Sequence, residues 1–325
     1  MHVLVTGGAG FIGSHLASYH LDRGDSVTVV DDLSTGSLNN LVPMLKNPAF
    51  LFHEADILVW EGLKHAVSRA DRIYHMAAIV GVKKVLEDPR AVMATNVAAT
   101  ERLFRAVADV RPDAHVTIAS SSEVYGFNPK GSFSETDDIV LRSGGRLRWC
   151  YAVTKLADEF IAYSFMYKSR INVVIARLFN TIGPRQTGKY GMVVPNFVRQ
   201  AVNNVPLTIY GDGTQTRSFC DVRDTVVALD LLASTPSANG EIVNVGNDAE
   251  ISILDLANLI VQRAGSSSSR QFLSYVEAYG MDIDEISHRR PILGKLHALT
   301  GFEPKWDLRK TLDNLIALER GGEEQ

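Results

Sequence analysis

The sequence predicts an α/β fold built on a doubly wound parallel sheet, with a smaller α/β region towards the C-terminus. Three observations support this fold. Strand-length apolar segments alternate with helix-period segments through about residue 180, and the first strand runs directly into a glycine-rich turn. The chain also has material for a large core, with 46% hydrophobic residues among 325. We therefore divide it into a first domain at residues 1–180 and a region at residues 181–325 that interleaves with the first.

The predicted elements follow one another as strand, helix and strand. Strands joined by helices in this way pair in parallel, because the crossover helix returns the chain to the same end of the sheet. Beyond residue 180, short helices mix with further strands, which predicts a smaller region beside the sheet. We expect strands near residues 2–6, 26–31, 49–54, 72–77, 115–121 and 172–178, and helices near residues 11–23, 58–69, 89–109 and 151–168.

A glycine-rich turn follows the first strand, with glycines at Gly7, Gly10 and Gly13. A strand, a glycine turn and a helix in this order are typical of a dinucleotide site in a Rossmann-type domain. Gly7 permits the tight turn, Gly10 lets a pyrophosphate approach the helix N-terminus, and Gly13 allows close packing of helix on strand. The spacing G-x-x-G-x-x-G differs from G-x-G-x-x-G, which argues against ordinary medium-chain dehydrogenases.

The second strand ends at two carboxylates, Asp31 and Asp32. Asp31 lies about 20 residues beyond the glycines, where a carboxylate accepts a hydrogen bond from the adenine ribose. The same carboxylate would repel a 2′-phosphate, and the segment Leu33–Gly36 contains no arginine that could bind one. The sequence therefore favours NAD over NADP as the cofactor.

Tyr151 and Lys155 are separated by four positions in a segment with helical periodicity. Positions i and i+4 share one face of a helix, so the Lys155 charge can favour the ionised form of Tyr151 and bring its pKa from near ~10 towards the working range. A phenolate of this kind is a general base for an alcohol proton. The pair can arise by chance on many helices, and its meaning depends on the rest of the chain.

The composition argues against several other classes of protein. A net charge of −4 leaves no basic surface for nucleic acid, and the longest apolar runs are too short to span a membrane. The N-terminus lacks a signal-peptide pattern and only two cysteines are present, so we expect a cytoplasmic location. Nine histidines are scattered without metal-ligand spacing, and we expect no metal.

Several separate motifs together resemble those of the extended short-chain dehydrogenase/reductases that modify nucleotide sugars. The resemblance covers nearly the whole chain. The motifs are the turn Gly7–Gly13, the segment His75–Ala78, Asn96, the serine run that leads into Glu123–Gly126, Tyr151–Lys155, Arg177–Asn180, and Arg289–Pro291.

This resemblance implies a role for each matched residue. Ser121 would bind the sugar 4-hydroxyl, Tyr151 would take its proton, and Lys155 would tune Tyr151 and hold the nicotinamide ribose, while C4 gives a hydride to NAD. Arg217, Arg289 and Asn180 would hold the diphosphate. The expected cofactor-binding residues are Gly7, Gly10, Phe11, Ile12, Gly13, Asp31, Asp32, Asp56, Ile57, Ala77, Ala78, Asn96, Tyr151 and Lys155, and the expected substrate-binding residues are Ser122, Asn180, Val194, Ile209, Tyr210, Arg217 and Arg289.

The reaction that follows formation of the 4-keto sugar depends on Glu123. By resemblance, a glutamate at this position is typical of UDP-glucuronate decarboxylases and of some 4,6-dehydratases, whereas simple 4-epimerases have a small residue. Arg148–Tyr151 also looks like a segment of bacterial UDP-glucuronate decarboxylases. Our first choice is therefore UDP-glucuronate decarboxylase. The alternatives are a UDP-sugar 4-epimerase, an NDP-sugar 4,6-dehydratase and, more distantly, a non-catalytic NAD-binding sensor.

The resemblance also implies a homodimer in which helices near 89–109 and 151–168 of two copies form a four-helix bundle. Six apolar side chains could form that interface or could equally face the sheet. They are Ala98, Ala99, Leu103, Phe160, Ile161 and Phe165.

Overall fold

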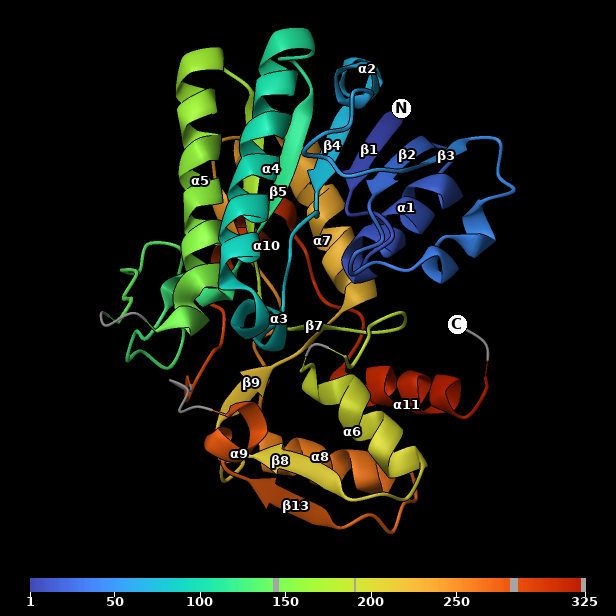
Figure 1. The fold of residues 1–325 in the computed structure, drawn as a ribbon, viewed down its shortest axis with the longest axis vertical. Helices are drawn as coiled ribbons and strands as arrows, with labels where there is room; N and C mark the ends of the chain where they lie inside the picture. The colour runs from blue at the N-terminus through green and yellow to red at the C-terminus, as the bar shows by residue number, and fades with distance from the viewer. Residues whose placement is uncertain (143–145, 190, 281–285, 323–325) are drawn as a thin grey trace.

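A seven-stranded parallel sheet forms the centre of the protein in a computed structural model that describes residues 1–142, 146–189, 191–280 and 286–322 (Figure 1). The strand order is β11-β6-β5-β4-β1-β2-β3, and every neighbouring pair is parallel. The predicted doubly wound sheet is confirmed. The strands are β1 (His2–Thr6), β2 (Ser26–Asp31), β3 (Phe50–Glu54), β4 (Arg72–His75), β5 (His115–Ser121), β6 (Asn172–Leu178) and β11 (Ile242–Val245).

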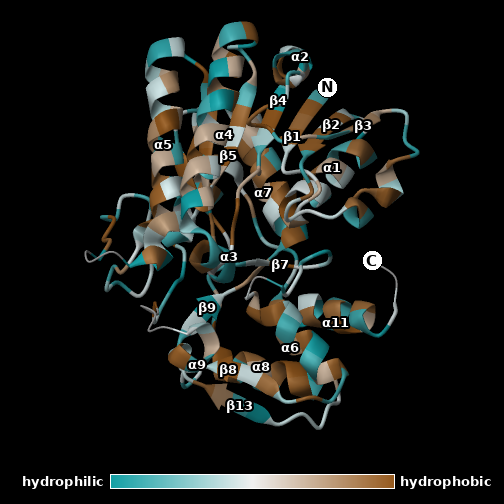
Figure 2. Cartoon of the chain, in the orientation of Figure 1, coloured by the Kyte–Doolittle hydropathy of each residue, from teal (hydrophilic) through white to brown (hydrophobic). Residues whose placement is uncertain are grey.

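Two layers of helices cover the sheet, because both faces of a parallel sheet are apolar and must be buried. Side chains alternate along β1, so Val3 and Val5 pack into one layer and Leu4 packs into the other. Figure 2 shows β1 and β2 as mainly hydrophobic. The first layer contains α1 (Phe11–Asp22), α7 (Val222–Ser234) and α10 (Gly294–Thr300), and the second contains α2 (Leu63–Arg69), α4 (Pro89–Val110) and α5 (Cys150–Ser169).

Two predicted elements differ from the structure by more than one residue at one end. The helix expected at residues 58–69 begins only at Leu63, because Asp56 closes a turn first: its carboxylate accepts from the Leu58 backbone N–H at 2.8 Å. The strand expected at 72–77 ends at His75. Beyond it the chain leaves the sheet, and Ala77 and Ala78 line a cavity.

The smaller region has a hydrophobic core of its own, between α6, α8 and α11. Its segments are not continuous, since α7 and β11 return to the large sheet. Residues 181–325 therefore contribute to both units. Their remaining elements are β7 (Thr181–Ile182), α6 (Val193–Val202), β8 (Leu207–Tyr210), β9 (Thr216–Ser218), β10 (Cys220–Asp221), η5 (Pro236–Ala238), β12 (Glu250–Ser252), α8 (Ile253–Arg263), β13 (Arg270–Leu273), α9 (Tyr275–Tyr279) and α11 (Leu308–Glu319).

The sheet reverses its order between β1 and β4. The carboxyl ends of these strands point towards the smaller region (Figure 1). Ligands of open α/β sheets bind at such a switch point. A cavity of about 740 Å³ lies there. Short helical segments complete the first domain: η1 (Leu38–Asn40), η2 (Val42–Met44), α3 (Val82–Glu87), η3 (Ser122–Tyr125) and η4 (Leu147–Trp149).

Candidate active site

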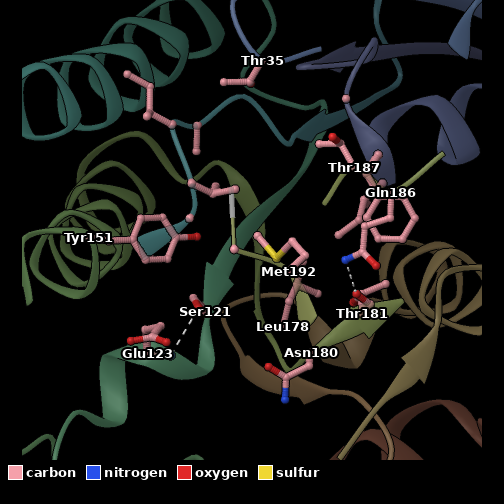
Figure 3. Close-up of a pocket in the computed structure, with 18 of the residues that line it drawn as sticks. Thr35, Ser121, Glu123, Tyr151, Leu178, Asn180, Thr181, Gln186, Thr187 and Met192 are labelled. Carbon is pink, nitrogen blue, oxygen red and sulfur yellow. Dashed lines mark hydrogen bonds between the residues drawn. The ribbon is translucent and has the colours of Figure 1, made fainter. Parts of the chain in front are cut away.

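The cavity brings together residues from both units of the protein (Figure 3). The glycine turn and the end of β2 form one part of it, and η3, α5 and the segments around β7 and β8 form the rest. Most of the side chains predicted from the sequence line this single space. They are Gly7, Gly10, Phe11, Ile12, Gly13, Asp31, Asp32, Asp56, Ile57, Ala77, Ala78, Ser121, Ser122, Glu123, Tyr151, Lys155, Asn180, Val194, Tyr210, Arg217 and Arg289.

Asn96 and Ile209 are not among the lining residues. Asn96 is buried on α4, where it accepts from the Ile79 N–H at 2.8 Å and donates to the Thr154 hydroxyl at 3.2 Å. It therefore holds the segment after β4 in place beside the cavity. Ile209 points into the core of the smaller region because side chains alternate along β8, and its neighbour Tyr210 faces the cavity instead.

The glycine turn has the geometry that a dinucleotide requires. Gly7 adopts φ +69°, and a Cβ on it would lie 2.6 Å from the Ala77 nitrogen. A Cβ on Gly13 would lie 2.3 Å from the Gly7 carbonyl oxygen, so only glycine allows this approach of helix to strand. At Gly10 a Cβ would meet only that same carbonyl oxygen, at 3.1 Å, which leaves the backbone open to a phosphate group.

Asp31 is fixed at the end of β2 by the backbone around it. One carboxylate oxygen accepts from the Ala9 N–H at 2.9 Å, and the other accepts from the Leu33 N–H at 2.8 Å. Burial raises its pKa, and these backbone donors partly oppose that effect. Each oxygen retains a second lone pair for a ribose hydroxyl. The glycine turn and Asp31 thus fit NAD, as predicted.

Tyr151 extends from α5 into the cavity, near Ser121 at the end of β5 (Figure 3). The Ser121 hydroxyl accepts from the Glu123 N–H at 3.2 Å. Burial raises the Tyr151 pKa, whereas the Lys155 charge and a hydrogen bond with Ser121 lower it, and the net direction is upward. Lys155 therefore lowers the Tyr151 pKa, as expected from the sequence, but the effect of burial outweighs that of its charge.

Glu123 lies at the centre of a cluster of cations. The Arg289 guanidinium donates to its Oε1, and Arg148 donates to its Oε2 at 3.4 Å. Burial alone would raise the Glu123 pKa, but the charges of Arg289, Arg148 and Arg217 outweigh it and lower the pKa to about 2. Glu123 is therefore a carboxylate throughout the physiological pH range.

Arg289 and Arg217 both line the cavity and contact other residues of the protein. The sequence predicts that Arg289 holds the diphosphate; in the structure it lines the cavity and donates to Glu123 and to the side-chain oxygen of Asn180, the latter at 3.1 Å. Arg217 lines the cavity and donates to the backbone carbonyls of Thr216 and Ile286 at 2.7 and 2.8 Å. Arg148 had no role assigned to it, although it lies only three positions before Tyr151.

The described part of the chain contains no group of three His, Cys, Asp or Glu side chains suited to a metal ion. In the same residues, no helix combines the length and the apolar character needed to cross a membrane.

The fold and the site together define a Rossmann-type enzyme that binds NAD and can oxidise an alcohol. The NAD dependent epimerase/dehydratase family matches residues 3–246, and the chain belongs to this family. It is thus an NAD-dependent nucleotide-sugar enzyme, which confirms the resemblance seen in the sequence.

Similar proteins extend this assignment over the whole chain. The chain is 36% identical to a UDP-N-acetyl-alpha-D-glucosaminuronate decarboxylase from Bacillus cytotoxicus, over 96% of each protein. It is 35% identical to UDP-glucuronic acid decarboxylase 2 from Arabidopsis thaliana, over 97% of this chain and 67% of the relative. Among solved structures, a UDP-glucuronic acid 4-epimerase from Bacillus cereus in complex with UDP-glucuronic acid and NAD superimposes with a TM-score of 0.89, at 29% identity over 99% of both chains.

Proposed function

We propose that the protein decarboxylates a UDP-hexuronate, either UDP-glucuronate or its 2-N-acetylated counterpart. The observation that carries this proposal is the ionised carboxylate of Glu123 held by Arg289 and Arg148 inside the cavity. The similarity to two decarboxylases over at least 96% of this chain supports the same reaction.

The first chemical step is oxidation at C4 of the sugar. Ser121 orients the 4-hydroxyl, and Tyr151 removes its proton as the C4 hydride leaves, which avoids a protonated carbonyl. Lys155 favours the ionised form of Tyr151 through its charge. NAD, when bound, accepts the C4 hydride and later returns it, so the overall reaction needs no external oxidant or reductant.

The second step breaks the bond between C5 and the carboxylate carbon. The 4-ketone lies β to that carboxylate, so the electron pair left by departing carbon dioxide is delocalised into an enolate. A proton then adds at C5, and the hydride returns to C4 while Tyr151 gives its proton back to the oxygen. The products are carbon dioxide and a UDP-pentose.

The electrostatics of Glu123 favour decarboxylation over 4,6-dehydration. A dehydratase needs a base that removes the C5 proton, and a carboxylate with a pKa of about 2 is a weak base. Decarboxylation requires no such base. Three arginines around one glutamate also leave an excess of positive charge, which suits the carboxylate and the diphosphate of a UDP-hexuronate.

A 4-epimerase acting on the same UDP-hexuronate is the second candidate. It is supported by the likeness to the UDP-glucuronic acid 4-epimerase, with a TM-score of 0.89. In that reaction the keto sugar would turn over in the cavity before the hydride returned, and the carboxylate would be retained.

Product analysis distinguishes these reactions. The purified protein would be incubated with NAD and, in separate reactions, UDP-glucuronate, its 2-N-acetylated counterpart, UDP-glucose and GDP-mannose. We expect loss of carbon dioxide from a hexuronate, detected by mass spectrometry of the sugar nucleotide. An unchanged mass with an inverted C4 in the NMR spectrum would identify the epimerase. Failure to convert any of the four would contradict an enzymatic function for this site.

The proposed assembly is a homodimer formed by α4 and α5. On α5, Phe160 is 67% exposed and Tyr167 is 89% exposed, which is unusual for side chains of this size. Six side chains were predicted from the sequence to face either the dimer interface or the sheet, and the structure does not place them all on one side. Ala99 and Leu103 are buried against the sheet and are excluded from the interface, and Phe165 stacks on Phe104 at 5.7 Å between ring centroids.

We also propose a cytoplasmic location. Cys150 and Cys220 are both free thiols, as expected of a protein in a reducing compartment. Their oxidation state in protein purified under non-reducing conditions, measured by thiol titration, tests this assignment.

A further inference from the structure

The acidic side chain of Asp158 lies beside Lys155, the residue that interacts with the proposed base Tyr151. Asp158 follows Lys155 by three positions on α5, and its Oδ2 lies 3.1 Å from the Lys155 Nζ. Both side chains are almost fully buried, at 2% and 4% exposure. Tyr151, Lys155 and Asp158 share one face of the helix because they are spaced by about one turn each. A buried ion pair is thus built into the helix that carries the base.

Polar groups from two other elements lie near this ion pair. Thr100 on α4 interacts with the Asp158 carboxylate, and its hydroxyl lies 3.1 Å from the His75 Nε2 at the end of β4. The other nitrogen of His75 is 2.7 Å from the Thr6 hydroxyl, in the residue just before the glycine turn. Polar side chains therefore lie between the start of the cofactor turn and the ion pair of Lys155 with Asp158.

We propose that Asp158 is a positioning residue: it anchors the Lys155 ammonium group against α4 and offsets part of the charge that Lys155 presents to Tyr151. This proposal rests on the proposed role of Tyr151 as the base. Of the three ammonium protons, the one directed at Asp158 is withdrawn from the cavity, which leaves two for Tyr151 and for the cofactor. The Asp158 charge also opposes ionisation of Tyr151 directly.

The other charged groups near the pair do not replace Asp158. Glu159, next on α5, faces Lys155 but is neutralised by Arg177 of β6, which donates to it at 2.9 and 2.7 Å. His75 is uncharged, because burial lowers its pKa to about 3. Glu123 raises the Tyr151 pKa but is itself paired with Arg289.

The test is a direct titration of Tyr151 in the NAD-saturated protein without any sugar. The chain has ten tyrosines, and the signal of Tyr151 in protein labelled with ¹³Cζ-tyrosine is identified by its absence in Tyr151→Phe. In Asp158→Asn we expect Tyr151 to titrate about one pH unit lower than in the wild type, because the full Lys155 charge then acts on it. The acid limb of kcat/KM should move in the same direction.

Asp109→Asn is the matched control, since Asp109 forms an exposed ion pair with Lys64, at 2.7 Å, and its removal should leave the titration unchanged. If Asp158→Asn does not fold, Asp158→Ala is the second variant, because alanine has a high helix propensity. The same downward shift of the Tyr151 titration is expected in it. An unchanged or higher titration midpoint in the folded Asp158 variant would overturn the proposal. The titration needs no turnover, so it decides the role of Asp158 even if the decarboxylase assignment fails.

Discussion

Arg289 and Glu123 are 166 positions apart in the sequence and form an ion pair in the cavity. The pair connects η3 of the first domain to the C-terminal segment, so the site exists only when both units are folded together. It also determines the protonation state of Glu123, whose ordinary pKa of 4.5 falls to about 2. Glu123 is therefore suited to electrostatic stabilisation as a carboxylate and is a poor general base.

Replacing Glu123 by glutamine should separate the two chemical steps. Oxidation at C4 depends on Tyr151 and Lys155, so reduced nicotinamide should still form when UDP-glucuronate is added. Release of carbon dioxide should fall by about 10²-fold, because the cations that surround the sugar lose their fixed counter-charge. Stopped-flow absorbance of the nicotinamide and mass spectrometry of the product measure the two steps. Full decarboxylation by Glu123→Gln would remove Glu123 from the mechanism.

Arg289→Met should add an acid limb from Glu123 to the pH dependence that Tyr151 gives the wild type. With Arg289 present, the lowered pKa keeps Glu123 ionised at every pH above about 2 to 3. Without that cation, burial raises the pKa, and activity should be lost on acidification as Glu123 becomes protonated. Profiles of kcat/KM between pH 5 and pH 8 would reveal the new acid limb. Arg290→Met is the control, since Arg290 is half exposed and lies 3.9 Å from Glu250; an identical profile for the two variants would contradict the assignment.

The parts of the site that the sequence predicts depend on local spacing. The glycine turn, Asp31 and the Tyr151–Lys155 face each lie within one strand, turn or helix, so their geometry follows from short-range rules. The pairing of Arg289 with Glu123 depends on how distant segments pack, and no periodicity predicts it. The burial of Tyr151 also depends on how distant segments pack. The direction of its pKa shift could therefore not be deduced from Lys155 alone.

The sequence predicts a strand that contains both Ile209 and Tyr210. The alternation of side chains along such a strand would have shown that only one of the two faces the cavity. Adjacent strand residues face opposite sides, so both could not reach one cavity. The role of Asn96 was less accessible, because its hydrogen bonds to Ile79 and Thr154 depend on the packing of α4 against α5.

The Tyr151→Phe variant should keep the shape of the cavity but should no longer catalyse oxidation at C4 of the sugar. Phenylalanine keeps the ring but has no ionisable oxygen, so turnover should fall by about 10²- to 10⁴-fold. Isothermal titration should give NAD and UDP-glucuronate affinities close to those of the wild type. Turnover at the wild-type rate would show that another group takes the 4-hydroxyl proton.

Gly13→Ala should weaken NAD binding by tenfold or more. The added Cβ would lie 2.3 Å from the Gly7 carbonyl oxygen, so either α1 or the turn must move away from the pyrophosphate position. Gly131→Ala is the control, because a Cβ there meets no atom within 4 Å. Calorimetric titration with NAD measures the effect, and thermal unfolding shows how much of it reflects lost stability. Equal affinity in the two variants would contradict a close approach of the cofactor to this turn.

Phe160→Asp should convert the proposed dimer into a monomer without changing the active site. Phe160 is 67% exposed on α5, and a carboxylate there would be buried without a partner if two copies packed along α4 and α5. Light scattering coupled to size-exclusion chromatography gives the mass of each variant. Val59→Asp is the matched control, because Val59 is 71% exposed in the segment before α2, away from α5. A wild-type protein that is monomeric at micromolar concentration, or a Phe160→Asp variant that remains dimeric, would exclude this surface as the interface.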